Sequence, residues 1–282
     1  MSELRASIII PHHEPTWPEP ALLSQAIEAV LAHTPGPYEI IVVDGGSTPG
    51  VRVWLASWQR ENNFLNALLL TANFGFTKHI NLGLRAASGQ NVVLLNSDIE
   101  VSPGWLEALE SGLDDPQVGV VGCQIRDMCD REQIVFGGAV GPAMHKLGWA
   151  DKGEFQERTY DDDYLTFACV LLRGETWRQV GELDEQFIIH CSDSDYCYRA
   201  KEAGWKLLYE PKAIVYHEQE GTLRHMRGRP AIEQILAQDQ ERFKSKWGNR
   251  LSSPAPHSAS ASLEAAATCP NTGNNQDDSD AS

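Results

Sequence analysis

The carboxylate of Asp98 is the first candidate for chemistry in this sequence. It closes residues 92–98, in which four apolar residues run without alternation and then stop at a short polar group. A strand that is buried on both faces of a parallel sheet has this pattern. Ligands of open α/β sheets bind at the carboxyl ends of the strands, so we expect Asp98 at a rim where it could hold Mg²⁺ or Mn²⁺. A helix N-cap or a solvated loop acid is the alternative role for this residue.

Other polar residues follow two further apolar stretches. Asp44 ends the stretch 39–44, and Pro11, His12 and His13 follow the stretch 7–10. Because the ends of parallel strands meet at one edge of a sheet, we expect these residues to line the same pocket as Asp98. Neighbouring side chains diverge in an extended loop, which argues against a metal site made by His12 and His13 together.

The elements that must position these residues alternate along the first half of the chain. Strands are predicted at 7–10, 39–43, 66–70, 91–95 and 118–122, and helices at 21–32, 51–60, 77–87 and 103–112. This alternation predicts an α/β fold with a doubly wound, mainly parallel sheet and helices on both faces. A hairpin or excursion is expected at 124–163, followed by strands at 165–173, 206–209 and 213–216 and helices at 176–180, 193–203 and 232–247.

Composition limits the possible partners and surroundings. The 282 residues are 42% hydrophobic, enough for a core, and their net charge of −16 argues against nucleic-acid binding, which needs a cationic face. The apolar runs are too short for a membrane helix and no signal peptide is apparent, so we expect a cytoplasmic protein whose membrane contact, if any, is peripheral. Residues 251–282 are rich in Ser, Ala, Pro, Asn and Asp and are predicted to be a disordered tail after one domain at 1–250.

Four blocks, taken in order, give the chain a resemblance to a known family. They are Ser-Ile-Ile-Ile-Pro at 7–11 with 39–47, Asn-Phe-Gly-Phe at 73–76 with Asn-Leu-Gly at 81–83, Asn-Ser-Asp at 96–98, and Gly-Glu-Leu-Asp at 181–184 with 187–199, Gly204 and Tyr216-His217. From about residue 7 to 247 the chain resembles the family 2 glycosyltransferases, in particular the rhamnosyltransferase-like members. These enzymes have the GT-A fold and use nucleotide-sugars.

The resemblance implies an inverting, metal-assisted sugar transfer in polysaccharide biosynthesis. It implies a nucleotide-diphosphate sugar donor bound mainly by residues 1–123, and a glycan, lipid-linked or protein acceptor bound by 124–250. The donor contacts it implies are Pro11, His12, His13, Asp44, Asn81, Asn96 and Asp98. It also implies Mn²⁺ or Mg²⁺ held by Asp98 and His217, and Asp193 as the catalytic base.

Each of these roles has a structural alternative. Asp193 could cap the helix that follows it, and Asp195 is a weaker candidate for the base. His217 could be a structural histidine, and Asn81 a buried amide bonded to the backbone.

Two departures from the family pattern keep other functions open. Gly45 stands where the family often has a second acid that contacts the nucleotide base, and Asn96 stands at the first acid of its Asp-x-Asp motif. A non-catalytic module that binds carbohydrate or a protein partner is therefore an alternative. A sugar-phosphate nucleotidyltransferase is another, but it needs a glycine-rich basic loop where this chain has residues 12–15, His-His-Glu-Pro.

Overall fold

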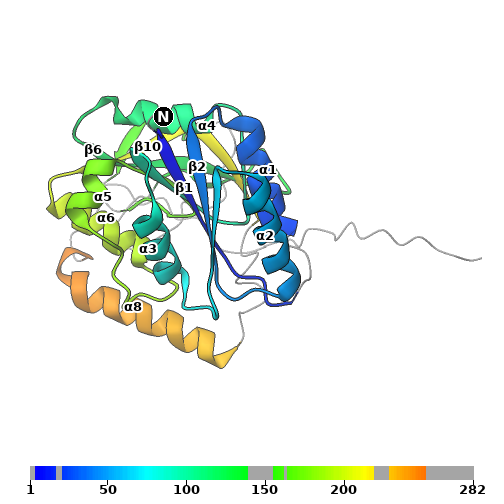
Figure 1. The fold of residues 1–282 in the computed structure, drawn as a ribbon. Coiled ribbons are helices and arrows are strands. Elements are labelled where there is room, and N and C mark those ends of the chain that lie inside the picture. Colours follow the sequence, from blue (N-terminus) through cyan, green and yellow to red (C-terminus); the bar gives the residue numbers. More distant parts are fainter. Residues whose placement is uncertain (1–3, 17–20, 139–154, 162–163, 219–228, 252–282) are drawn as a thin grey trace, which may run out of the picture.

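The computed structural model describes residues 4–16, 21–138, 155–161, 164–218 and 229–251, and these build one mixed sheet with helices packed against it (Figure 1). The strands are β1 (Ala6–His12), β2 (Tyr38–Asp44), β3 (Leu65–Leu69), β4 (Asn91–Leu95), β5 (Ile99–Val101), β6 (Val118–Asp127), β7 (Ile134–Phe136), β8 (Thr159–Asp161), β9 (Cys169–Leu172) and β10 (Lys206–His217). Their order is β3-β2-β1-β4-β9-β6-β10-β5, with β7 beside β6 and β8 beside β10.

The direction of the strands confirms a mainly parallel sheet. Neighbours β3, β2, β1 and β4 are parallel, and β6 is parallel to β10. Strand β9 lies between β4 and β6 and is antiparallel to both, so these six strands run the same way. Their carboxyl ends therefore meet at one edge of the sheet, as the sequence predicts.

Seven α-helices and a short 3-10 turn are found within the described residues. They are α1 (Ala21–His33), α2 (Pro49–Glu61), α3 (Phe76–Ala86), α4 (Trp105–Ser111), α5 (Gly174–Val180), α6 (Ser192–Glu202) and α8 (Pro230–Leu251), with η1 at Gly112–Asp114. Helix α3 packs on β1 and β2, and α4 packs on β6 and β10. The long α8, orange in Figure 1, runs along one side of the molecule below α3 and α6.

The central strands are buried as their unbroken apolar runs predict. The Ile, Val and Leu residues of β1, β2 and β4 are fully buried, and they belong to one large hydrophobic cluster. Burial of that extent is the main favourable term in folding. It fixes these strands as a rigid support for the polar residues that follow them.

Three elements differ from the prediction. The strand expected at 165–173 is the shorter β9. The two strands expected at 206–209 and 213–216 form one strand, β10, whose pairing with β6 shifts register between Glu210 and Ile214. Strand β5 was not predicted, and it pairs with the end of β10. The shift accommodates Pro211, which lacks the backbone N–H that regular pairing needs.

Two predictions about chain organisation are not tested by this fold. The predicted tail at 251–282 lies outside the described residues except for Leu251, the last residue of α8. The division into donor-binding and acceptor-binding parts at residue 123 stays a prediction. In the part of the chain that is described, no helix has the length and apolar character that a membrane crossing demands.

Candidate functional site

The ends of β1 and β2 bring His12 and Asp44 side by side. The two residues are partners in the parallel register of these strands, and Asp44 is 0% exposed. The Asp44 Oδ2 atom lies 3.3 Å from the amide nitrogen of Ser47 and 3.4 Å from Nη1 of Arg52. The Oδ1 atom has no hydrogen-bond partner among the described residues. A buried carboxylate oxygen without a donor is costly unless a ligand supplies one.

His12 adds two more buried polar atoms at this edge. Both of its ring nitrogens lack a hydrogen-bond partner within the described chain, as does Nδ1 of His13. Burial lowers the pKa of His12 to about 4, although the Asp44 carboxylate acts in the opposite direction. The His12 ring is therefore neutral at physiological pH and offers one donor and one acceptor. Pro11, which precedes it, is buried within β1 opposite Val43.

Asp98 and His217 lie close together at the same edge. Strand β5 begins directly after Asp98 and pairs antiparallel with the end of β10, where His217 lies opposite Ile99. The Oδ1 atom of Asp98 is 3.2 Å from Nε2 of His217, yet it forms no hydrogen bond with any described residue. The Oδ1 atom of Asn96 is likewise buried and unpartnered in the described structure.

The Asp98–His217 pair fits a divalent cation in its donor chemistry. A carboxylate oxygen and an imidazole nitrogen that approach each other without a hydrogen bond can both face one ion, and Mn²⁺ accepts both ligand types. In the described parts of the chain, no group of three or more His, Cys, Asp or Glu side chains could hold a metal. Among the described residues this pair would supply two ligands to such a cation, and substrate phosphate or water could supply others.

His79 occupies the space that a side chain at position 45 would need. A Cβ atom added to Gly45 would lie 2.3 Å from Cε1 of His79, which is far too close. The His79 ring is buried and its Nε2 accepts a hydrogen bond from the amide of Phe74, at 3.3 Å. Burial lowers the pKa of His79 to about 4. With His79 in this position, a second acid after Asp44 would not fit, and no local sequence pattern distinguishes this histidine.

Asp193 lies in the first turn of α6 and is half-buried. The N-cap of α6 is Cys191, so Asp193 lies in the first turn and not at the cap itself, where its carboxylate is still favourable at the positive end of the helix. Its Oδ1 accepts a hydrogen bond from the Ser194 amide at 2.8 Å. Burial raises the pKa of the Asp193 carboxyl above its ordinary value, although the Ser194 amide opposes this. A raised pKa makes a carboxylate a better proton acceptor.

Asp195, two residues further on, is a structural residue. It is 0% exposed, and Oδ1 accepts a hydrogen bond from Nε1 of Trp247 at 2.8 Å. Its carboxylate also pairs with Nε of Arg199 at 2.9 Å and with Nζ of Lys246 at 2.7 Å. With both oxygens paired to protein groups and the side chain fully buried, Asp195 is poorly placed to receive a substrate proton.

The Asn81 side chain bonds to the interior of the protein. Its Nδ2 donates to the carbonyl of Leu183 at 2.9 Å, and its Oδ1 accepts from the amide of the same residue at 2.9 Å. Nδ2 also contacts Oε1 of Glu185 at 3.2 Å. This arrangement favours the alternative given above, a buried amide bonded to backbone, over a donor contact.

The loop that leads into α6 touches the segment that leads into α3. A Cβ atom on Gly75, the N-cap of α3, would lie 2.9 Å from the carbonyl oxygen of Ile188. Gly75 also has a φ of 92°, which favours glycine. This contact brings the segment before Asp193 against the segment before His79.

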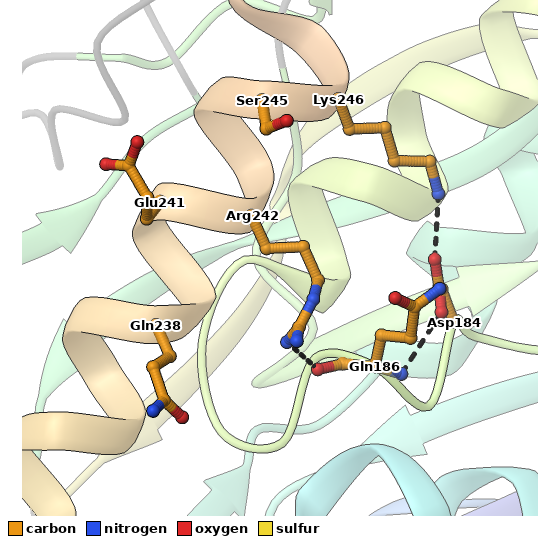
Figure 2. A pocket seen from close by; sticks show the side chains of 7 residues that line it. All are labelled: Asp184, Gln186, Gln238, Glu241, Arg242, Ser245 and Lys246. Atoms are coloured by element: carbon orange, nitrogen blue, oxygen red, sulfur yellow. Dashed lines mark hydrogen bonds and ion pairs between the residues drawn. The ribbon is translucent and has the colours of Figure 1, made fainter.

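A separate cavity lies between α8 and the loop after Gly181 (Figure 2). Its volume is about 710 Å³, and it is lined by Asp184, Gln186, Gln238, Glu241, Arg242, Ser245 and Lys246. The Nζ atom of Lys246 pairs with Asp184 at 2.9 Å, and Arg242 donates to the carbonyl of Gln186. No predicted site residue lines this cavity. Its two cationic side chains, Arg242 and Lys246, already bind the loop and hold α8 against it.

Comparison with known proteins gives a match over more than half of the chain. The family model described as Glycosyl transferase family 2 matches residues 7–173. The O-antigen biosynthesis protein RfbC of Myxococcus xanthus is 29% identical over 231 residues, which are 78% of this chain and 18% of that protein. The N-acetylglucosaminyl-diphospho-decaprenol L-rhamnosyltransferase of Mycobacterium tuberculosis is 27% identical over 242 residues, 76% of each chain.

The lengths of some relatives differ strongly from that of this chain. It spans 18% of RfbC and 27% of an uncharacterized Sinorhizobium fredii protein, y4gI, that is also 27% identical. Solved structures share the fold. A structure of GalNAc-T7 with UDP, GalNAc and Mn²⁺ gives a TM-score of 0.64 at 20% identity, over 76% of this chain and 44% of that one. The mannosyltransferase PcManGT of Pyrobaculum calidifontis, with GDP-Man and Mn²⁺, gives 0.62 at 18% identity, over 90% and 66%.

Proposed function

The chain belongs to glycosyl transferase family 2 and has the GT-A fold, and we propose that it transfers a sugar from a nucleotide-diphosphate sugar to an acceptor hydroxyl with inversion. One observation carries this proposal. Buried polar atoms without hydrogen-bond partners in the described chain gather where β1, β2 and β4 end: both nitrogens of His12, Oδ1 of Asp44, Oδ1 of Asn96 and Oδ1 of Asp98. Single atoms of this kind occur elsewhere in the molecule, but several at one edge of the sheet form a place where a polar ligand can supply the missing partners.

The donor nucleotide is proposed to bind beside β1 and β2. Asp44 Oδ1 can accept a hydrogen bond from a ribose hydroxyl or a base N–H, and the neutral His12 can both donate and accept. His13 and Pro11 would line the same place. His79 fills the space beside Gly45, so the base would meet an imidazole here in place of a second carboxylate.

Asp98 and His217 are the proposed ligands of Mn²⁺ or Mg²⁺, with Asn96 close to the diphosphate. The structures of GalNAc-T7 and PcManGT were solved with Mn²⁺, which supports a divalent cation. Such an ion, when bound, stabilises the negative charge that gathers on the leaving diphosphate. A cation also explains how a protein with a net charge of −16 can bind an anionic donor.

Asp193 is the proposed base. The acceptor oxygen attacks the anomeric carbon, the bond from this carbon to the diphosphate oxygen breaks, and the nucleoside diphosphate leaves with the electron pair. The hydroxyl proton passes to the Asp193 carboxylate. A single displacement of this kind inverts the configuration at the anomeric carbon. Support comes from the raised pKa of Asp193 and from the burial of Asp195, whose two oxygens pair with protein groups.

The acceptor is proposed to be a glycan, a lipid-linked sugar or a protein, at the cytoplasmic side of the cell. The relatives include an enzyme named for a diphospho-decaprenol acceptor and a protein named for O-antigen biosynthesis, so lipid-linked saccharides are the first acceptors to try. Contact with a membrane-bound acceptor would be peripheral for the described part of the chain.

The proposal can be tested by a transfer assay with a panel of nucleotide-sugars and lipid-linked or soluble acceptors, with and without Mn²⁺. We expect transfer that requires the metal and is abolished by Asp193→Asn, while this variant still binds the donor. Glu202→Gln, at the exposed far end of α6, is the matched control and should retain activity. Donor binding without transfer in the wild-type protein would favour a non-catalytic binding module instead.

A further inference from the structure

Asp239 of α8 holds the backbone of the loop before α6. Its side chain is 0% exposed, and its Oδ2 accepts hydrogen bonds from the amides of Ile188 at 3.1 Å, Ile189 at 2.9 Å and His190 at 2.9 Å. Oδ1 also lies 3.1 Å from the Ile188 amide. Hydrogen bonds to an ionised carboxylate are stronger than those between neutral groups. Three successive amides that face one carboxylate leave this loop little freedom.

The loop leads directly into α6, the helix that carries the proposed base. His190 is followed by Cys191, which has a φ of 64° as the N-cap of α6, and Asp193 is the second residue of that helix. A left-handed conformation is unfavourable for a residue other than glycine and persists only when its surroundings enforce it. The hydrogen bonds that Asp239 accepts from the amides of residues 188–190, just before Cys191, hold the backbone at the point where α6 starts.

Helix α8 is also fastened to α6 through a small aromatic cluster. This cluster contains Phe187, Cys191, Tyr198, Phe243 and Trp247, and it is separate from the main core. The rings of Tyr198 and Trp247 are 5.2 Å apart and nearly perpendicular, and those of Phe187 and Phe243 are 6.5 Å apart. The cluster spans from the loop to the middle of α6, so α8 supports both sides of the segment that carries Asp193.

We propose that α8 positions the catalytic base and that Asp239 is the positioning residue through which it acts. This inference rests on the proposed function, because it takes Asp193 as the base. The family model matches residues 7–173, whereas α8 begins at Pro230. The inference therefore gives a role in the reaction to a helix outside the matched part of the chain. Asp239 does not touch the substrate in this account, and it acts by fixing residues 188–190 and through them Asp193.

The proposal predicts a defect in turnover that is separate from donor binding. Replacing Asp239 with asparagine keeps the size of the side chain but removes the negative charge that strengthens these hydrogen bonds, and it places an amide N–H₂ against the Ile188 amide in the position of Oδ1. A small displacement of a catalytic group can lower the rate on the order of 10²-fold, so we expect a loss of this size in kcat with an unchanged donor KM. Asp239→Glu, which keeps the carboxylate, should retain more of kcat than Asp239→Asn.

The experiment compares steady-state transfer by the full chain with backbone amide exchange. In Asp239→Asn the amides of residues 188–190 should exchange faster than in the wild type. Leu109→Ala is the control, because it opens a cavity in the main core beneath α4, outside the aromatic cluster and without removing a hydrogen bond to the loop. At a similar loss of stability in urea, Leu109→Ala should keep much more of its kcat than Asp239→Asn.

Two results would overturn the positioning role while the proposed function stands. One is a wild-type kcat in Asp239→Asn despite faster exchange of the loop amides. The other is an equal loss of kcat in Asp239→Asn and in Leu109→Ala at matched stability, which would show that Asp239 serves stability alone. A wild-type protein that transfers no sugar from any donor would instead refute the proposed function itself, and the positioning role with it.

Discussion

Replacing Asp195 with alanine should destabilise the protein strongly. The carboxylate is fully buried and accepts from Trp247 at 2.8 Å and from Arg199 at 2.9 Å. Removing one member of a buried ion pair costs about 3–5 kcal/mol, because its partners stay buried without compensation. The Lys246 side chain is 35% exposed and would still pair with Asp184, so the loss of its ion pair with Asp195 costs little. Arg199 keeps the carbonyls of Val180 and Glu182, so we expect the lower end of this range.

Urea unfolding followed by circular dichroism measures this loss. Asp195→Ala should lower the free energy of unfolding by about 3 kcal/mol, whereas Asp193→Asn should change it by less than about 1 kcal/mol, since that side chain is only half-buried. The two variants should thus separate a structural acid from a catalytic one two positions away. A loss below about 1 kcal/mol in Asp195→Ala would refute the idea that Asp195 is the buried anchor between α6 and α8.

Three further variants or conditions give distinct results. Gly45→Ala should cost about 1–3 kcal/mol in urea unfolding through overpacking against His79, and much less in a chain that also carries His79→Ala; equal costs would contradict the contact. His217→Ala should weaken Mn²⁺ binding at least about tenfold in calorimetry with a nucleoside diphosphate present, whereas Asp193→Asn should leave it unchanged. Because burial lowers the pKa of His12 and of His79 to about 4, the unfolded chain binds more protons below the ordinary value of 6.5. The contribution of these two histidines to the free energy of unfolding should therefore be fully present above about pH 6.5 and be lost as the pH falls towards about 4. The free energy of unfolding should fall less steeply with pH in His79→Gln than in the wild type; an equal slope in the two proteins would contradict this.

The central sheet and its polar rim follow from simple patterns in the sequence. The unbroken apolar run before Asp98 indicates a strand buried on both faces, and the structure places β4 in that environment. The encounter of Asp98 with His217 could not be predicted in this way. It depends on the pairing of β5 with the end of β10, and a three-residue strand is too short to show a period. Only the resemblance to a family linked these two residues.

Long-range contacts account for most of what the sequence did not predict. Pro211 divides the pattern of β10, although the strand continues across it with a shift in register. His79 lies on a regular helix, and nothing local shows that its ring lies over Gly45. The buried position of Asp239, in contrast, is indicated by its spacing in the sequence of α8. It falls four residues after Ile235 and four before Phe243, on the apolar side of α8, where an acid needs buried partners.

The binding of a nucleoside diphosphate tests the central claim most directly, because the claim is that the unpartnered atoms at the ends of β1, β2 and β4 receive a nucleotide-sugar. Calorimetric titration of UDP, GDP and dTDP in the presence of Mn²⁺ should give saturable binding of at least one nucleotide. This binding should depend on the metal, and it should be weakened in both Asp44→Asn and Asp98→Asn. Absence of binding by all three, or binding that neither variant affects, would contradict the account.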